Sequence, residues 1–174
     1  MLTLLFFIIM DRVEYLKLAS QIHFKVKQTI LKKVFSDLNI KLADLRDFIH
    51  TEITNELSNL TNIGQKNLAF PIGLSGDSIV AHYTPTKISD TLQTYLPYYL
   101  NPSTPIRYFN IIKIDYGIHL DGNIIDKAFS VNIHETELES VLIKASNEAV
   151  ESMKSTIGVD AVSYTHLTLP TIGC

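Results

Sequence analysis

Apolar side chains recur at helical spacing in two segments near the start of the chain. In residues 10–34 they follow one another every three, four or six positions, which is close to the period of a helix with one apolar face. These positions are Val13, Leu16, Ile22, Val26 and Ile30. A second series predicts an amphipathic helix over residues 42–60, after which Asn62 and Gly64 break the pattern. The sequence therefore predicts two successive helices.

The next part of the chain has weaker periodicity. Residues 68–82 are consistent with two short strands around a turn at Gly73 and Gly76, because glycine favours turns. Residues 84–107 contain four of the six prolines and little periodicity, so we expect a loop there.

A β-hairpin and a third helix are predicted after this loop. Residues 108–118 and 123–133 are apolar, β-branched runs, and the Asp-Gly pair between them is a strong hairpin signal. Thr136 and Glu139 have the spacing of a capping box, which opens a helix that Gly158 would cap. The order helix, helix, strands, hairpin, helix predicts an α+β fold, in which helices cover an antiparallel sheet.

Both ends of the chain differ in character from the rest. Residues 1–9 are almost wholly apolar, but a membrane span needs about 20 such residues and a signal peptide needs a basic start. We expect Met10 to be the natural start and residues 1–9 to be upstream sequence read in frame. Residues 162–171, VSYTHLTLPT, resemble the translation of a transposase adapter used to prepare sequencing libraries, although such residues also suit a strand. We therefore expect a natural portion over residues 10–160 and an adapter-derived tail over residues 161–174.

Composition places the chain among ordinary globular proteins. Apolar residues make up 46% of its 174 residues and charged residues 19%, which excludes disorder. The formal net charge of −3 disfavours a basic surface for nucleic acid. The single cysteine, Cys174, excludes a disulfide scaffold and a multi-cysteine zinc site. We expect a soluble cytoplasmic protein with no nucleic-acid or membrane partner.

Two aspartates interrupt the apolar strands of the predicted hairpin. A turn at Asp121-Gly122 places Asp115 opposite Ala128 and diagonal to Asp126, whereas a turn centred one residue earlier places the two aspartates directly opposite each other. Either register puts both carboxylates on one face, within about 4.5–8 Å. A divalent cation between them would relieve their repulsion. The alternative is a pair of solvated aspartates on a polar face.

His82 is a second candidate, because it ends an apolar run in the segment Ala-His-Tyr-Thr-Pro. A neutral imidazole there could bind a substrate or a metal, or it could be a structural histidine bonded to backbone. The sequence contains no glycine-rich nucleotide motif, no phosphate-binding loop, no G-x-S-x-G and no H-E-x-x-H.

Two segments resemble motifs of the type II methionine aminopeptidases. LAFPIGLSGDSIVAHYTPT, residues 68–86, is similar to the family's AFP…S…AHYTP segment. IIKIDYGIHLDGNIIDKAFSV, residues 111–131, is similar to its KIDxGxHxxGxIxDxA segment, and the start at Met10 resembles its first helix. The resemblance covers residues 10–160 and implies the first half of a pita-bread (creatinase/aminopeptidase-like) catalytic domain, an incomplete α+β fold.

The resemblance also implies a metal-dependent enzyme that removes the initiator methionine from nascent proteins. Asp115 would bind one of two divalent ions (Co, Mn, Fe or Zn), and Asp126 would bridge both. His82 would be catalytic through contact with the scissile amide, and Phe70 would line the pocket for the methionine side chain, where apolar contact suits a thioether. The implied partners are the N-terminal methionine of nascent polypeptides and the ribosome.

The sequence also departs from the family. The family completes its metal site with a histidine and two glutamates further along its chain, and this sequence stops before them, so we expect the 174-residue chain to be inactive alone. Asp77 stands where many relatives carry asparagine, and the loop at residues 87–107 is longer than in typical members.

Two other interpretations share the same fold. One is a non-catalytic module that binds RNA or protein, but such members lose metal ligands, whereas this chain keeps Asp115, Asp126 and His82. The other is a hydrolase of proline peptides, which would share both aspartates. Phe70 and the His-Tyr-Thr-Pro segment favour the methionine aminopeptidase.

Overall fold

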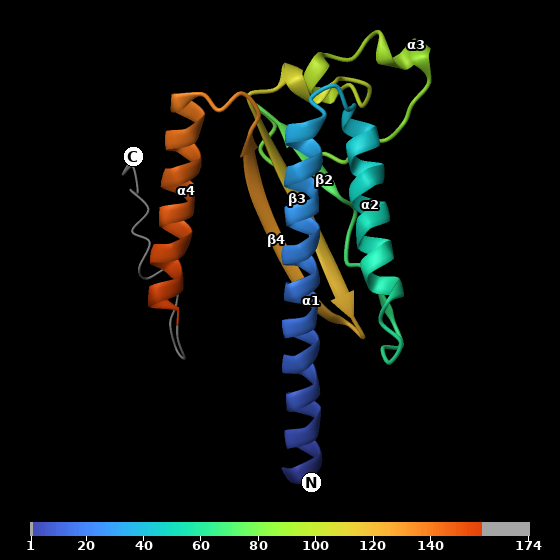
Figure 1. Cartoon of the computed structure of the whole chain (residues 1–174), viewed down its shortest axis with the longest axis vertical. Helices are drawn as coiled ribbons and strands as arrows, with labels where there is room; N and C mark the ends of the chain where they lie inside the picture. Colours follow the sequence, from blue (N-terminus) through green and yellow to red (C-terminus); the bar gives the residue numbers. More distant parts are fainter. Residues whose placement is uncertain (1, 158–174) are drawn as a thin grey trace, which may run out of the picture. The chain divides into compact units, whose positions relative to one another are not determined.

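The computed structural model in Figure 1 describes the backbone of residues 2–157 and the side chains of residues 12–157. The predicted cap Gly158 and the predicted tail at residues 161–174 lie outside these described residues. The chain divides into a first unit that ends at Glu135 and a second unit that begins at Thr136, and each is considered by itself.

The first unit is organised around a four-stranded antiparallel sheet (Figure 1). Its central strand is β3 (Ile111–Leu120), which pairs along one side with β4 (Asn123–Asn132). Along its other side β3 pairs with β1 (Lys66–Leu68) near one end and with β2 (Gly73–Gly76) near the other. The predicted α+β class with an antiparallel sheet is confirmed.

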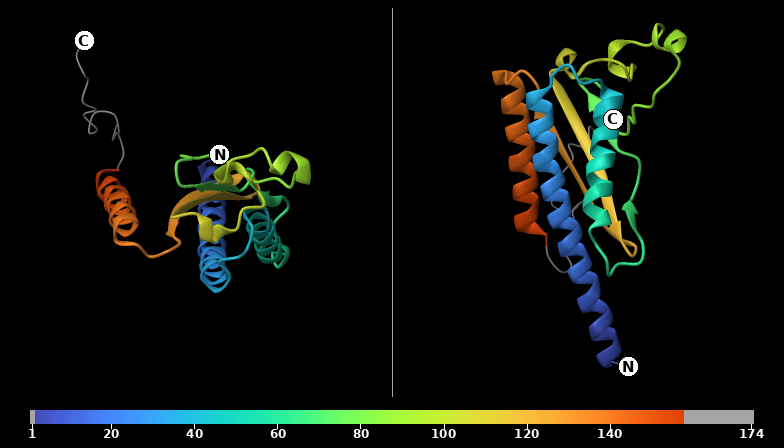
Figure 2. Two further views of the ribbon diagram at one scale, coloured as in Figure 1. Left: turned by 90° about the horizontal axis from the view of Figure 1, so that it is seen from above. Right: turned by 45° about the vertical axis from the view of Figure 1, so that its right-hand side comes forward.

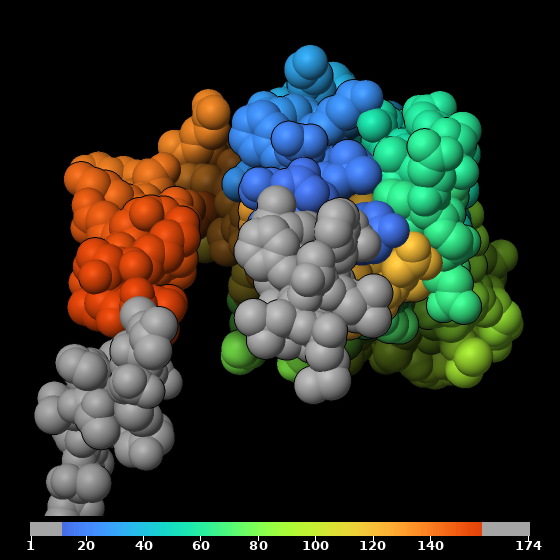
Figure 3. Space-filling model, turned by 90° about the horizontal axis from the view of Figure 1, so that it is seen from below, coloured from blue at the N-terminus to red at the C-terminus, as the bar shows by residue number. Residues whose placement is uncertain are grey.

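Helices α1 (Leu2–Ser36) and α2 (Leu42–Ser58) lie side by side on one face of the sheet (Figure 2). Helix α1 packs against β3 and β4, and α2 packs against β1 and β2. Seen from below, atoms of both helices lie next to those of the β3–β4 turn (Figure 3). Many of the fully buried side chains come from the two helices and from every second residue of β3: Val26, Ile30, Ile49, Ile53, Ile112, Ile114, Tyr116 and Ile118.

Helix α1 begins earlier than the predicted start at Met10, because it extends back to Leu2. The intervening residues include several leucines, which are good helix formers, and no proline or glycine interrupts them. The assignment of residues 1–9 to upstream sequence stays a prediction. Helix α2 matches its prediction and ends two residues early.

The predicted turn at Gly73 and Gly76 is wrong, because these glycines begin and end strand β2. A Cβ atom on Gly76 would lie 2.2 Å from the ring of Phe109, which is fully buried. A Cβ atom on Gly73 would lie 3.4 Å from Cβ of Asp115 on the neighbouring strand. The glycine at position 76 thus allows an aromatic ring to approach the backbone closely instead of reversing the chain.

The β3–β4 hairpin has its turn at Asp121-Gly122, and both residues have positive φ angles, 47° and 79°. Such angles define the tight turn that matches the twist of paired strands, and Asp-Gly favours it. Asp115 therefore pairs with Ala128, which is one of the two predicted registers. The Asp121 carboxylate also accepts a 2.6 Å hydrogen bond from the Gln65 amide, which fixes the turn against the chain before β1.

Residues 84–107 form the predicted loop, interrupted only by short helical turns: α3 (Asp90–Gln93), η1 (Tyr98–Leu100) and η2 (Ile106–Tyr108). Its first residues are joined to α2 by Lys87, which forms ion pairs with Asp44 and Asp47. Its last residues are joined to the start of α2 by backbone hydrogen bonds, such as that from the Leu42 amide to Thr104.

The second unit contains helix α4 (Glu137–Thr156). It begins directly after Thr136, as the capping box predicts, and the Thr136 hydroxyl donates a hydrogen bond to the Glu139 carboxylate. None of its side chains is buried. Among the described residues, none of the helices combines the length and apolar character that crossing a bilayer requires.

His23 of α1 is buried between the helix and the sheet, although no pattern in the sequence around it indicates a functional or structural role. Its ring stacks on Tyr116 at a centroid distance of 4.0 Å, and its Nε2 donates a 3.2 Å hydrogen bond to the Lys127 carbonyl. The Tyr116 hydroxyl donates in turn to the His23 carbonyl at 2.9 Å. Burial lowers the pKa of His23 below 6.5, because the cationic form is poorly solvated there.

We expect the stability of the first unit to fall as the pH drops from about 7 to about 5. Because the folded pKa of His23 is lowered, its contribution is complete above the unfolded value of 6.5 and is lost as the pH falls through the folded pKa. The loss is at most about 1.4 kcal/mol per pH unit. Thermal unfolding of His23→Gln should show a flatter pH dependence than the unmodified chain. The exposed helical variant His50→Gln should keep the full slope, and equal slopes for both variants would contradict the assignment.

Candidate functional site

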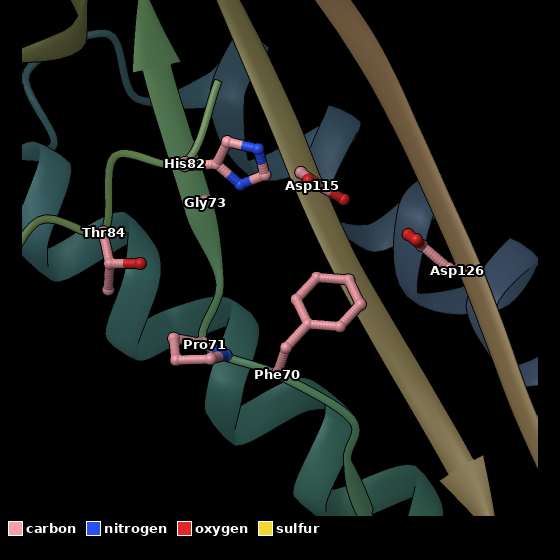
Figure 4. A pocket seen from close by; sticks show the side chains of 7 residues that line it. All are labelled: Phe70, Pro71, Gly73, His82, Thr84, Asp115 and Asp126. Atoms are coloured by element: carbon pink, nitrogen blue, oxygen red, sulfur yellow. The ribbon is translucent and has the colours of Figure 1, made fainter.

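A pocket of about 380 Å³ lies on the face of the sheet that points away from α1 and α2 (Figure 4). It is lined by Phe70, Pro71, Gly73, His82, Thr84, Asp115 and Asp126. All four residues predicted from the sequence therefore meet in one place. Sequence reasoning missed Pro71, Gly73 and Thr84 as lining residues, although all three stand inside the first quoted motif segment, residues 68–86.

The two strands of the hairpin bring the carboxylates together. Asp115 follows the buried Ile114 on β3, so alternation along the strand turns its side chain to the pocket face. Asp126 on β4 pairs with Gly117, two residues beyond Asp115, which makes the aspartates diagonal neighbours. Their carboxylates point toward the same space (Figure 4).

The surroundings of Asp115 disfavour the ionised form of its carboxylate. Burial raises its pKa above 3.8, and the negative charge of Asp126 raises it further, whereas the nearby His82 acts in the opposite direction. Its Oδ1 atom is buried and has no hydrogen-bond partner among the described residues. Buried carboxylate oxygens normally accept a hydrogen bond, so the bare Asp115 oxygen is an exception.

A divalent cation fits this pair of carboxylates in part. Hard cations prefer oxygen ligands, and a cation would both satisfy the bare Asp115 oxygen and cancel the repulsion from Asp126. Within the described residues, however, no group of three or more histidine, cysteine, aspartate or glutamate side chains is placed to bind one metal ion. Asp115 and Asp126 are thus suited to be two ligands of a larger set.

Phe70 forms the apolar wall of the pocket, and Gly117 makes room for it. The amide of Ala69 donates a 2.9 Å hydrogen bond to the Gly117 carbonyl, which holds the chain against β3 after β1 has ended. A Cβ atom on Gly117 would lie 2.4 Å from Cε1 of Phe70. Only glycine at this position allows the Phe70 ring to lie flat beside the two aspartates.

His82 reaches the pocket from the segment that follows β2, with its ring directed toward Asp115 (Figure 4). Its φ angle is 65°, in the left-handed region that residues other than glycine seldom adopt. Residues held in such conformations cluster at functional sites, because surrounding contacts must maintain them. His82 thus combines a left-handed backbone with an exposed side chain at the pocket.

Asp77, which departs from the family pattern, lies outside the pocket. Its Oδ1 accepts hydrogen bonds from the amides of Asn110 and Ile111, at 2.9 and 3.1 Å. Its Oδ2 accepts a 2.9 Å hydrogen bond from the Tyr98 hydroxyl. Asp77 therefore joins the long loop to the beginning of β3 and does not contact the two aspartates.

Comparisons with known proteins agree with the architecture and the motifs. No protein-family model matches the chain. It is 26% identical over 141 residues to methionine aminopeptidase 2 of Debaryomyces hansenii, and the match covers 81% of this chain and 29% of that protein. The same enzyme of Saccharomyces cerevisiae is 26% identical over 147 residues, and that match covers 81% and 31% of the two chains. The chain thus spans less than a third of the length of these relatives.

A solved structure of a thermophilic Arx1 has a similar fold, with a TM-score of 0.55 and 22% sequence identity. The match covers 73% of this chain and 32% of that one. The chain therefore has part of the α+β pita-bread fold, as predicted. Its resemblance to methionine aminopeptidase 2, which the two motifs indicate, is confirmed by the curated relatives.

We expect Asp126→Asn to stabilise the metal-free chain at about pH 7, because it removes the like charge beside the Asp115 carboxylate. Asp126 is exposed, so the gain should be about 0.5 kcal/mol, or roughly 1–3 °C in Tm. Thermal unfolding in the presence of a chelator measures it. Asp90→Asn, an exposed carboxylate on α3, is the matched control and should leave Tm unchanged. A lower Tm for Asp126→Asn would show that the two carboxylates do not repel.

Proposed function

We propose that this chain is the N-terminal part of a metal-dependent aminopeptidase that removes the initiator methionine from nascent proteins. The observation that carries the proposal is the meeting of Asp115, Asp126, His82 and Phe70 in one pocket. The similarity to methionine aminopeptidase 2 supports it. The N-terminal methionine of nascent chains would be the substrate, and a cytoplasmic location beside the ribosome follows from that substrate.

Asp115 would bind one divalent ion and Asp126 would bridge two, as the resemblance implies. Ions in such a site act as Lewis acids toward the substrate carbonyl and lower the pKa of bound water. The remaining ligands of the family, a histidine and two glutamates, come from a part of its chain that this sequence does not include. The chain alone is therefore proposed to be inactive.

The side chains of this chain would bind and orient the substrate. The Phe70 ring offers an apolar surface for the thioether of methionine. His82 lies on the other side of the pocket from Asp126, where its imidazole could donate a hydrogen bond to the scissile amide (Figure 4).

We expect Asp126→Asn to abolish most activity in a protein that joins this chain to the remainder of a methionine aminopeptidase 2. A bridging ligand serves both ions, so kcat/KM for a methionyl peptide should fall by about a hundredfold or more, ~2.7 kcal/mol in barrier. Asp90→Asn is again the control. A loss within about tenfold would refute the bridging role.

In the same protein, His82→Ala should lower kcat and leave the metal content unchanged, because His82 is assigned to the substrate and not to the ions. Steady-state kinetics and elemental analysis measure the two quantities. Loss of bound metal in this variant would instead make His82 a ligand.

A panel of peptides separates the proposal from the two other interpretations. Cleavage of peptides that begin with methionine supports the aminopeptidase. Cleavage restricted to bonds that precede proline would identify a proline-peptide hydrolase. A well-folded, metal-loaded protein that cleaves neither kind of peptide would favour a non-catalytic module that binds RNA or protein.

A further inference from the structure

Tyr83, the residue after His82, is hydrogen-bonded to two residues of β2 and to one residue of the long loop. Its amide donates to Oγ of Ser75 at 3.3 Å. Its carbonyl accepts a 2.7 Å hydrogen bond from the amide of Leu74. Its hydroxyl donates a 2.6 Å hydrogen bond to the carbonyl of Leu100, in the long loop. Backbone and side chain are thus both fixed immediately beside a site residue.

The surroundings of Tyr83 make these bonds effective. Its ring packs against the hydrophobic core, and burial raises the pKa of its hydroxyl, so the group remains a hydrogen-bond donor. Hydrogen bonds are stronger where water is partly excluded. The Tyr83–Leu100 bond is partly buried, whereas the bond from the Tyr98 hydroxyl to Asp77 is exposed.

The loop residue that accepts this bond is itself held to the sheet. Leu100 ends the turn η1, and Tyr98 begins it. The Tyr98 hydroxyl donates to Asp77, and the Tyr98 carbonyl accepts a 2.8 Å hydrogen bond from the Thr104 hydroxyl. The position of η1 is thus stabilised by the two hydrogen bonds of Tyr98, and the Tyr83 hydroxyl is bonded to the last residue of this turn.

His82 needs such support, because its left-handed backbone is sterically unfavourable for a residue that has a Cβ atom. Its ring is exposed, so packing around the ring does not supply that support. The bonds that hold the next residue are therefore the ones that keep His82 directed into the pocket.

We propose that Tyr83 is the positioning residue for His82 and that the loop turn η1 fixes Tyr83 through its hydroxyl. The catalytic role of His82 rests on the proposed function, whereas the contacts that set its position are independent of that function. The long loop accordingly acts on the site through one side chain, and a change in the loop reaches the pocket through the Tyr83–Leu100 hydrogen bond.

The test compares Tyr83→Phe with Tyr99→Phe in the chain as it stands. Both variants remove one hydroxyl and keep the ring, and Tyr99 lies in η1 against Tyr98. Two measurements at one fixed pH are needed: the imidazole signals of His82 in a two-dimensional NMR spectrum, and the hydrogen exchange of the Leu74 and Tyr83 amides.

Tyr83→Phe should move the His82 signals and speed exchange of both amides by about fivefold, as expected for the loss of a hydrogen bond of ~1 kcal/mol. Tyr99→Phe should change neither. Unchanged His82 signals in Tyr83→Phe, or equal shifts in both variants, would overturn the proposal.

Tyr98→Phe tests the loop's part in it, because this variant releases η1 from Asp77 and leaves Tyr83 intact. It should move the same His82 signals in the same direction by a smaller amount. If it leaves them unchanged, the loop does not set the position of His82. These measurements read geometry and not turnover, so their failure is distinct from a failure of the proposed aminopeptidase activity.

Discussion

The pairing of β3 with β4 is the constraint on which the rest of the first unit depends. Neighbouring residues of a strand point to opposite faces, so one register decides the orientation of both strands at once. In the observed register Ile114 and Tyr116 face the helices and Asp115 faces the pocket. A shift of β4 by one residue would exchange its two faces and carry Asp126 to the helical side. The Asp121-Gly122 turn, with its two positive φ angles, excludes that shift.

Local patterns predict most, though not all, of the elements of this fold. The helices, the hairpin and the α+β class follow from the spacing of apolar side chains within each segment. Asp115 and Asp126 are predicted to share one face of the sheet because both candidate registers of the hairpin place them there. The choice between these registers needed backbone angles. The misassigned Gly73 and Gly76 show the opposite case, because a glycine that makes room for Phe109 cannot be distinguished in sequence from a glycine that turns the chain.

The pocket was predictable only where a motif named its residues. Phe70, His82, Asp115 and Asp126 come from segments that resemble one family, and the structure brings them together. The role of Gly117 beneath Phe70 and the fastening of Tyr83 to Leu100 depend on contacts between distant segments, which no local pattern encodes. The pocket also combines a bare, buried carboxylate oxygen with a like charge beside it, an arrangement that favours a bound cation over an apolar ligand.

Strand β4 pairs with β3 along one edge, and within residues 2–157 its other edge pairs with no strand. Main-chain groups along such an edge bind any extended segment through hydrogen bonds that do not depend on side-chain identity. A segment that pairs there would lie about 4.8 Å from β4, and every second one of its side chains would be on the same face as Asp126, with the one opposite Asp126 nearest its carboxylate. The alignment of such a segment with β4, more than its overall composition, would then decide which chemical groups complete the carboxylate side of the pocket.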